Sequence, residues 1–135
     1  MPRFDISPQL RETSVLTMLK AAVGVARELR APSGVAIVDA SGLLRAWALM
    51  DGATPLAAEI VPKKARTAAF SGQPTGAVPA DISAQLASAS DVFVALPGGL
   101  PIILDGTVIG GIAAGGASAD NDVAIAQAGL DVLGH

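Results

Sequence analysis

Near the start of the chain, hydrophobic residues recur among polar ones with the spacing of an amphipathic helix. Its apolar residues recur every three or four positions: Leu16, Leu19, Ala22, Val23, Ala26 and Leu29. Ser7 offers a capping hydroxyl immediately before Pro8, and proline is favoured at the first position of a helix. The segment Pro32-Ser33-Gly34 ends the pattern. We therefore expect a helix that begins at Ser7-Pro8 and ends before Pro32.

Two short apolar runs after this helix predict a first β-hairpin. Residues 35–38 form one run and residues 43–50 form the other, which carries the single tryptophan of the chain. The residues between them, Asp39-Ala40-Ser41-Gly42, are typical of turns. A connection this short requires antiparallel pairing of the two strands.

A second hairpin is predicted near the C-terminal end. Asp105-Gly106 separates an apolar run at 101–104 from another at 107–113. A two-residue type I′ turn needs positive φ at both central positions, and Asp and especially Gly reach that conformation at low cost. These two runs are therefore expected to be antiparallel partners.

A helical pattern in the middle of the chain is interrupted by a proline. Residues 57–70 have helical spacing, but Pro62 would remove one backbone hydrogen bond and clash with the preceding turn. A helix that begins near Val61, with Pro62 at its first position, avoids this conflict. Residues 55–60 would then form a separate turn or short helix.

The remaining elements follow a loop rich in glycine and proline at residues 71–79. The pattern predicts a short helix at 80–89, a strand at 92–96 and a last helix capped by residues 118–120. Asp120 is placed favourably against the dipole of that helix. The order of elements predicts an α+β fold, with a mostly antiparallel sheet and flanking helices.

Composition indicates one domain, residues 1–135, with a single core. The chain is 51% hydrophobic but only 3% aromatic, so Ala, Val, Leu and Ile must build that core. An apolar surplus on a chain this small indicates that other subunits cover part of its surface. We therefore expect a homo-oligomer.

Charge and residue usage exclude several classes of function. The formal net charge is −3 and the basic residues are mostly scattered, which disfavours nucleic acid as a partner. The chain has no cysteine, so thiolate chemistry is excluded. Charged residues interrupt the apolar positions of residues 10–29, and the N-terminus lacks the pattern of a secretory signal. We expect no membrane span and a cytoplasmic location.

Glycines accumulate where the second hairpin ends, at Gly110, Gly111, Gly115 and Gly116. A strand normally prefers β-branched residues, so this cluster indicates that something approaches the backbone closely. Tight packing against a helix or a subunit is one interpretation, and contact with a ligand is the other.

A basic cluster follows Pro62. Successive residues of a helix point about 100° apart, so Lys63 and Thr67 share a face that Lys64 and Arg66 do not. Cations at a helix start oppose the helix dipole unless an anion is held there. The cluster predicts either a site for a carboxylate or phosphate, or a solvated surface with salt bridges.

Acid–base and metal chemistry have little support. Asp120 and Asp122 point to different faces of the last helix and do not form a general acid/base couple. The single histidine, His135, is the last residue. A Ser-His-Asp triad and a histidine metal site are therefore not expected, and no metal ligands are predicted.

Several blocks of this sequence together resemble the GlcG/HbpS-like family, which includes the C-terminal domain of PduO-type proteins. The blocks are Leu96-Pro97-Gly98-Gly99-Leu100-Pro101-Ile102 with the Asp-Gly turn and glycine-rich strand that follow, Ala36 to Leu44, Met50 to Ala53, Lys64 to Phe70, and Asp122 with Ala126 and Gly129. The resemblance implies a five-stranded profilin-like sheet flanked by helices, and an assembly such as an octamer. It also implies a role for Lys64, since a Lys before Ala recurs there, and it matches Asp122 to an Asp in the last helix.

Haem or another tetrapyrrole is the ligand class that the resemblance implies. The residues that usually ligate haem iron are restricted to Met1, Met18, Met50 and His135, so no axial ligand is obvious. The chain also has Gly115 where the family pattern usually has Ser, which removes a hydroxyl. The cofactor therefore stays unknown, and haem would have to bind weakly or with help from a hydroxyl.

The hypothesis that follows is a homo-oligomer that binds a small anionic ligand. The predicted ligand-binding residues are Lys64, Arg66, Thr67, Gly98, Gly99, Gly115 and Gly116. The alternative is an enzyme, a lyase, isomerase or dehalogenase-like protein acting on a small organic acid. There Lys64 or Arg66 would hold a carboxylate and Asp122 would move protons. A further alternative is a non-catalytic accessory subunit.

Overall fold

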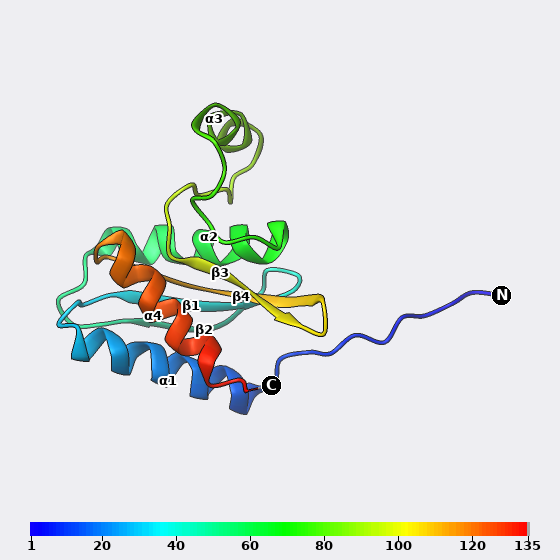
Figure 1. Ribbon diagram of the computed structural model, residues 1–135, viewed down its shortest axis with the longest axis horizontal. Helices are drawn as coiled ribbons and strands as arrows, with labels where there is room; N and C mark the ends of the chain where they lie inside the picture. The colour runs from blue at the N-terminus through cyan, green and yellow to red at the C-terminus, as the bar shows by residue number, and fades with distance from the viewer. Residues whose placement is uncertain (135) are drawn as a thin grey trace.

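A computed structural model describes residues 1–134 and places one antiparallel sheet between two layers of helices (Figure 1). The sheet has the order β2 (Leu44–Leu49), β1 (Gly34–Asp39), β4 (Thr107–Gly115), β3 (Gly99–Leu104). Helices α1 (Glu12–Glu28) and α4 (Ala119–Asp131) cover one face, and α2 (Pro55–Ser71) covers the other. Helix α3 (Ala80–Ala89) projects away from this body (Figure 1).

Strand β1 shows why both faces of the sheet need a cover. Its side chains alternate between the two faces, so Val35 and Ile37 join the core under α1 and α4. Ala36 and Val38 join a second core under α2. Because residues on both faces are apolar, the strand reads as a continuous hydrophobic run and is buried at every position except its last.

Both predicted hairpins are confirmed. In the first, Gly34 pairs with Leu49. In the second, Leu104 pairs with Thr107 across Asp105 and Gly106, whose φ values are +51° and +79°. Positive φ at both central positions is the requirement of the predicted turn.

The first helix begins later than Ser7-Pro8 predicted. Helix α1 starts at Glu12, and residues 1–9 lie outside any helix with exposed side chains. A capping sequence stabilises a helix only when an apolar face can pack, and most of the stability of a helix in a protein comes from that packing. Leu10 is buried where the core begins, whereas Phe4 is 90% exposed.

The predicted start of the middle helix at Pro62 is wrong. Helix α2 is continuous from Pro55 to Ser71 and contains Pro62. Pro55 stands at the start, where its missing N–H is not needed. The small apolar residues of α2 that pack on the sheet, Ala57, Val61, Ala65 and Ala69, offset the hydrogen bond that Pro62 removes.

The predicted strand at 92–96 is absent among the described residues, so the sheet has four strands and not five. The hydroxyl of Thr67 takes the place of a neighbouring strand for the backbone of this segment. It lies 2.7 Å from the Val92 carbonyl oxygen and accepts a hydrogen bond from the Val94 N–H at 3.0 Å.

The helix at 80–89 is confirmed as α3. The last helix is capped as predicted: the Ser118 hydroxyl accepts from the Asn121 N–H at 3.2 Å.

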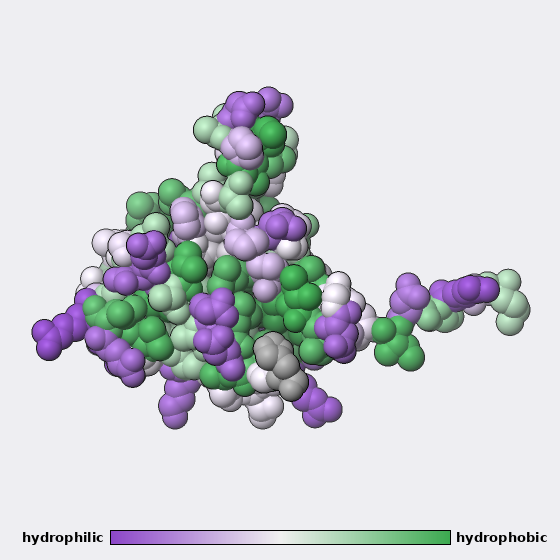
Figure 2. All heavy atoms as spheres, viewed as in Figure 1, coloured by the Kyte–Doolittle hydropathy of each residue, from purple (hydrophilic) through white to green (hydrophobic). Residues whose placement is uncertain are grey.

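Figure 2 shows the N-terminal segment and α3 extending beyond the body, with hydrophobic residues on the surface of both. Within residues 1–134, none of the helices has the length and apolar character needed to cross a membrane.

Candidate functional site

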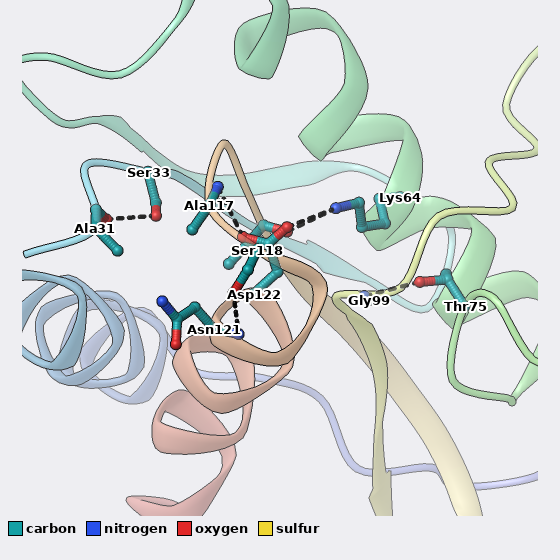
Figure 3. A network of polar contacts seen from close by, with 10 residues as sticks. Ala31, Ser33, Lys64, Thr75, Gly99, Ala117, Ser118, Asn121 and Asp122 are labelled. Carbon is teal, nitrogen blue, oxygen red and sulfur yellow. Dashed lines mark hydrogen bonds and ion pairs between the residues drawn. The ribbon is translucent and has the colours of Figure 1, made fainter. Parts of the chain in front are cut away.

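A lysine is buried where α2 crosses the end of the sheet. The Lys64 side chain is 2% exposed, and its Nζ donates a hydrogen bond to the Ala114 carbonyl at 2.8 Å. The same nitrogen lies 3.8 Å from Oδ2 of Asp122 in the first turn of α4 (Figure 3). Helices from opposite faces of the sheet thus bring one cation and one carboxylate together.

Asp122 is held in place by the connection between β4 and α4. Its Oδ1 accepts a hydrogen bond from the Ala117 N–H at 3.1 Å, and its own N–H donates to the Ser118 carbonyl at 2.8 Å. Ser118 is also the cap of α4, so the same short loop starts the helix and orients the carboxylate (Figure 3). This leaves Oδ2 directed at Lys64.

Glycines surround this pair. A Cβ at Gly98, where φ is +118°, would lie 2.9 Å from Asp122 Cβ and 3.0 Å from Lys64 Nζ. A Cβ at Gly99 would lie 2.7 Å from the Lys64 carbonyl oxygen, and one at Gly115 would lie 3.2 Å from Lys64 Nζ. The start of β3 and the end of β4 can therefore approach the charged groups only because these residues have no side chain.

A cavity of about 250 Å³ opens beside the pair. Its wall is mostly apolar, with residues from the start of α2, from Leu96-Pro97 and from the β4–α4 loop. Among the described residues that line it, Lys64 and Asp122 carry the charges. Charged groups in a largely apolar concave wall are the usual arrangement of a small-molecule site.

Burial moves both groups toward their neutral forms. It lowers the pKa of the Lys64 ammonium below its usual 10.5, and the Asp122 carboxylate opposes this only in part. It also raises the pKa of the Asp122 carboxyl above 3.8, against the opposing effects of Lys64 and the Ala117 N–H. Perturbed titratable groups at a cavity wall are a common feature of functional sites.

The structure brings together some of the predicted site residues. Lys64, Gly115 and Gly116 line the cavity with Asp122, and Gly98 and Gly99 pack behind the charged pair. Gly111 instead serves helix packing, because a Cβ there would press on the Ala65 carbonyl. The packing interpretation of the glycine cluster is thus confirmed at Gly111, whereas ligand contact at Gly115 and Gly116 stays a prediction.

Arg66 and Thr67 lie elsewhere. The Arg66 Nε donates to the Gly42 carbonyl at 3.0 Å and so holds the turn between β1 and β2. Thr67 binds the segment at residues 92–94. The rotation of about 100° per residue sends these neighbours of Lys64 to other sides of α2.

Sequence reasoning missed the backbone groups of the site. The Ala114 carbonyl and the Ala117 N–H complete the contacts of Lys64 and Asp122, and neither alanine carries a signal in the sequence. Leu96 and Pro97 also line the cavity. Their position directly before Gly98-Gly99 could have indicated this role, but the sequence pattern predicted that Leu96 ends a strand at 92–96.

The fold and the cavity define a small α+β domain with a charged pair buried at the end of its sheet. The chain belongs to the HbpS-like family, whose model, Haem degrading protein HbpS-like, matches residues 10–131. The resemblance noted from the sequence is thereby confirmed. Within residues 1–134, no group of three or more His, Cys, Asp or Glu could hold a metal ion.

Relatives of known sequence or structure agree with this assignment. Protein GlcG of Escherichia coli K12 is 32% identical over 80 residues, which span 58% of this chain and 60% of GlcG. The PduOC:haem complex has a TM-score of 0.83 at 29% identity, covering 94% of this chain and 96% of that one. A double mutant of HbpS from Streptomyces reticuli has a TM-score of 0.85 at 31% identity, covering 98% and 92%.

Proposed function

We propose that the cavity beside Lys64 and Asp122 binds a small ligand that carries a carboxylate. The observation that carries this proposal is the buried ammonium group of Lys64 at the cavity wall. An ammonium group has three donors, and Ala114 accepts one of them. A charge-assisted hydrogen bond from another donor to a ligand carboxylate would compensate part of the cost of burying the cation.

The charge balance of the site makes binding depend on a proton. Lys64 and Asp122 neutralise each other when both are ionised, so a second carboxylate would add an uncompensated negative charge. The raised pKa of the Asp122 carboxyl, caused mainly by burial, lets it take up a proton when the ligand enters. Lys64 would then pair with the ligand in place of Asp122.

The size of the cavity favours a small organic acid over a tetrapyrrole. Its volume of about 250 Å³ is at the lower end of the pockets that hold drug-sized molecules, which run from about 300 to 1,000 Å³. The haem complex of the relative PduOC and the HbpS-like family itself support the tetrapyrrole class. The residues lining this cavity do not fit that cofactor, because none of them is His, Cys, Met or Tyr.

An enzyme acting on a small organic acid is the second candidate. The pKa shifts of Lys64 and Asp122, both due chiefly to burial, favour it. Groups that exchange a proton readily are the ones that general acid–base catalysis uses.

We also propose that the protein acts as a homo-oligomer. Helix α3 stands away from the body and carries Ile82 and Leu86, which are 46% and 39% exposed (Figure 1). Leu56 and Leu96, at the cavity, are 64% and 57% exposed. A second copy that covers such residues would bury apolar area. Light scattering should find an assembly at micromolar concentration, and a stable monomer would contradict this part of the proposal.

Calorimetric titration with a matched pair of ligands tests the binding site. Propionate should bind to the unaltered chain, whereas propionamide, which has the same shape without the charge, should not. Lys64→Met should weaken propionate binding by roughly 10- to 100-fold, about 1.5–3 kcal/mol for a hydrogen bond to a charged group. Lys63→Met is the control, because that neighbouring lysine is exposed. Equal losses in both variants, or equal binding of both ligands, would contradict the proposal.

A further inference from the structure

The contacts of Lys64 differ from those of a lysine that serves only to stabilise the fold. A buried structural ion pair compensates its desolvation with short hydrogen bonds, about 2.7–2.9 Å between nitrogen and oxygen. The distance from Lys64 Nζ to Asp122 Oδ2 is 3.8 Å. The carboxylate is therefore near enough to exchange a proton through a small movement, but does not tie up the nitrogen.

The buried side chain of Lys64 also forms part of the cavity wall. Ala114 accepts one hydrogen of Nζ at 2.8 Å, and Lys64 and Gly115 both line the cavity. A Cβ at residue 115 would stand 3.2 Å from Nζ, so only a glycine leaves the nitrogen without a side-chain neighbour at that position. A neutral amine held by one hydrogen bond keeps a lone pair that can be directed at a bound molecule.

We propose that Lys64 is a nucleophile that forms an imine with a small carbonyl compound of the 2-oxo acid class, with Asp122 as its proton donor. This inference rests on the proposed function, because the same cavity must admit the acid. Beyond binding, it adds a covalent step, and it requires that the ligand carry a ketone carbon next to its carboxylate. Lysines that act this way are activated by desolvation in an apolar pocket, which is the environment of Lys64.

The reaction balances without an oxidant or a reductant. The lone pair of Nζ attacks the carbonyl carbon, a C–N bond forms, and the carbonyl oxygen takes a proton from the Asp122 carboxyl. Asp122 takes a proton back from the nitrogen and passes it to the hydroxyl group, which leaves as water while the C=N bond forms. The two hydrogens of that water thus come from Asp122 and from the amine, and the product is a protonated imine beside the ionised Asp122. The protonated imine also lies beside the carboxylate of the 2-oxo acid.

The pKa shifts support this chemistry. Burial lowers the pKa of Lys64, and a pKa lower by one multiplies the neutral fraction of an amine about tenfold at neutral pH. The exposed Lys63 on the same helix lacks this burial and provides an internal reference.

Borohydride trapping with pyruvate tests the inference on the unaltered chain. Reduction of an imine adds a stable carboxyethyl group, which peptide mapping by mass spectrometry assigns to a residue. We expect one group per chain, on Lys64, and labelling of Lys64 faster than that of Lys63. Lys64→Arg keeps the charge but cannot form the imine, and should remove the label. The mapping on the unaltered chain decides the question even where this variant fails to fold.

Lactate separates the two proposals, because it has the carboxylate of pyruvate but no carbonyl carbon. Calorimetric binding of lactate together with trapping of pyruvate on Lys64 supports both. Lactate binding without a label on Lys64, or with equal labelling of Lys63, overturns the nucleophile and leaves the binding site standing. If lactate and pyruvate both fail to bind and no label forms, the proposed function fails as well.

Discussion

Nζ of Lys64 lies 3.8 Å from Oδ2 of Asp122, although their helices pack on opposite faces of the sheet. The two side chains meet beyond the end of β4, where glycines leave room for them. For a buried ion pair, the cost of removing both charges from water can exceed their attraction. The pair therefore supports the proposed chemistry at the cavity.

Removing one member of the pair should destabilise the protein more than removing the charge of both. Lys64→Met leaves the Asp122 carboxylate buried without a counterion, and we expect a loss of about 3–5 kcal/mol in the free energy of unfolding. Adding Asp122→Asn keeps an oxygen that can accept from Ala117 and removes the charge, so part of this loss should be recovered. Urea unfolding of these two variants and of Asp122→Asn alone measures the three values. Strictly additive effects would show that the two side chains do not interact.

The same two variants should differ in their dependence on pH. Burial raises the pKa of the Asp122 carboxyl above 3.8, so the folded chain holds this proton more tightly than the unfolded chain. The cost of burying the ionised group is absent below the unfolded pKa and is complete above the folded pKa. The stability of Lys64→Met should therefore fall, relative to Lys64→Met/Asp122→Asn, as the pH rises above about 4 through the raised pKa of Asp122. Parallel stability curves over this range would contradict the shift.

Binding of a carboxylate should take up a proton. Asp122 must be neutralised when a second negative charge enters, and its raised pKa, due to burial, makes it the acceptor. Calorimetry in buffers of different ionisation enthalpy measures the uptake, and affinity should increase as the pH falls through this pKa. Asp122→Asn should abolish the uptake. Proton release on binding would be incompatible with this mechanism.

Gly98→Ala should damage the site through its backbone. The φ of +118° is strained for alanine, and the new Cβ would lie 2.6 Å from the Ala114 carbonyl oxygen that holds Lys64. We expect a loss of about 1–3 kcal/mol in stability, together with weaker ligand binding. Gly24→Ala is the matched control: it lies in α1 with open space around it, and should stabilise the chain by about 0.5–1 kcal/mol. A change at Gly98 as mild as the one at Gly24 would argue against this close packing.

Arg66→Ala should lower stability without changing ligand binding. Its Nε holds the Gly42 carbonyl in the turn between β1 and β2, and one such hydrogen bond contributes about 1 kcal/mol. Thermal unfolding and propionate titration of the same variant separate the two effects. A large loss of affinity with unchanged stability would place Arg66 at the ligand after all.

Local signals in the sequence were sufficient for much of the fold. Asp105-Gly106 determines its hairpin because few residues tolerate positive φ at both positions, and neighbouring strands need no other information to pair. Ser118 likewise identifies the start of α4 from one side chain and the next backbone N–H groups. The resemblance of the motif blocks added the family, and it singled out Lys64 and Asp122 separately.

The tertiary structure decided what depends on distant partners. Packing on the sheet keeps α2 continuous through Pro62, and the Thr67 hydroxyl replaces the neighbour that a strand at 92–96 would have needed. The meeting of Lys64 and Asp122 likewise depends on two helices, the ends of two strands and the backbone of alanines and glycines. A sequence pattern reports what each residue prefers over a few neighbours. Which buried groups meet is set by long-range packing, in which the energy of each contact depends on all the others.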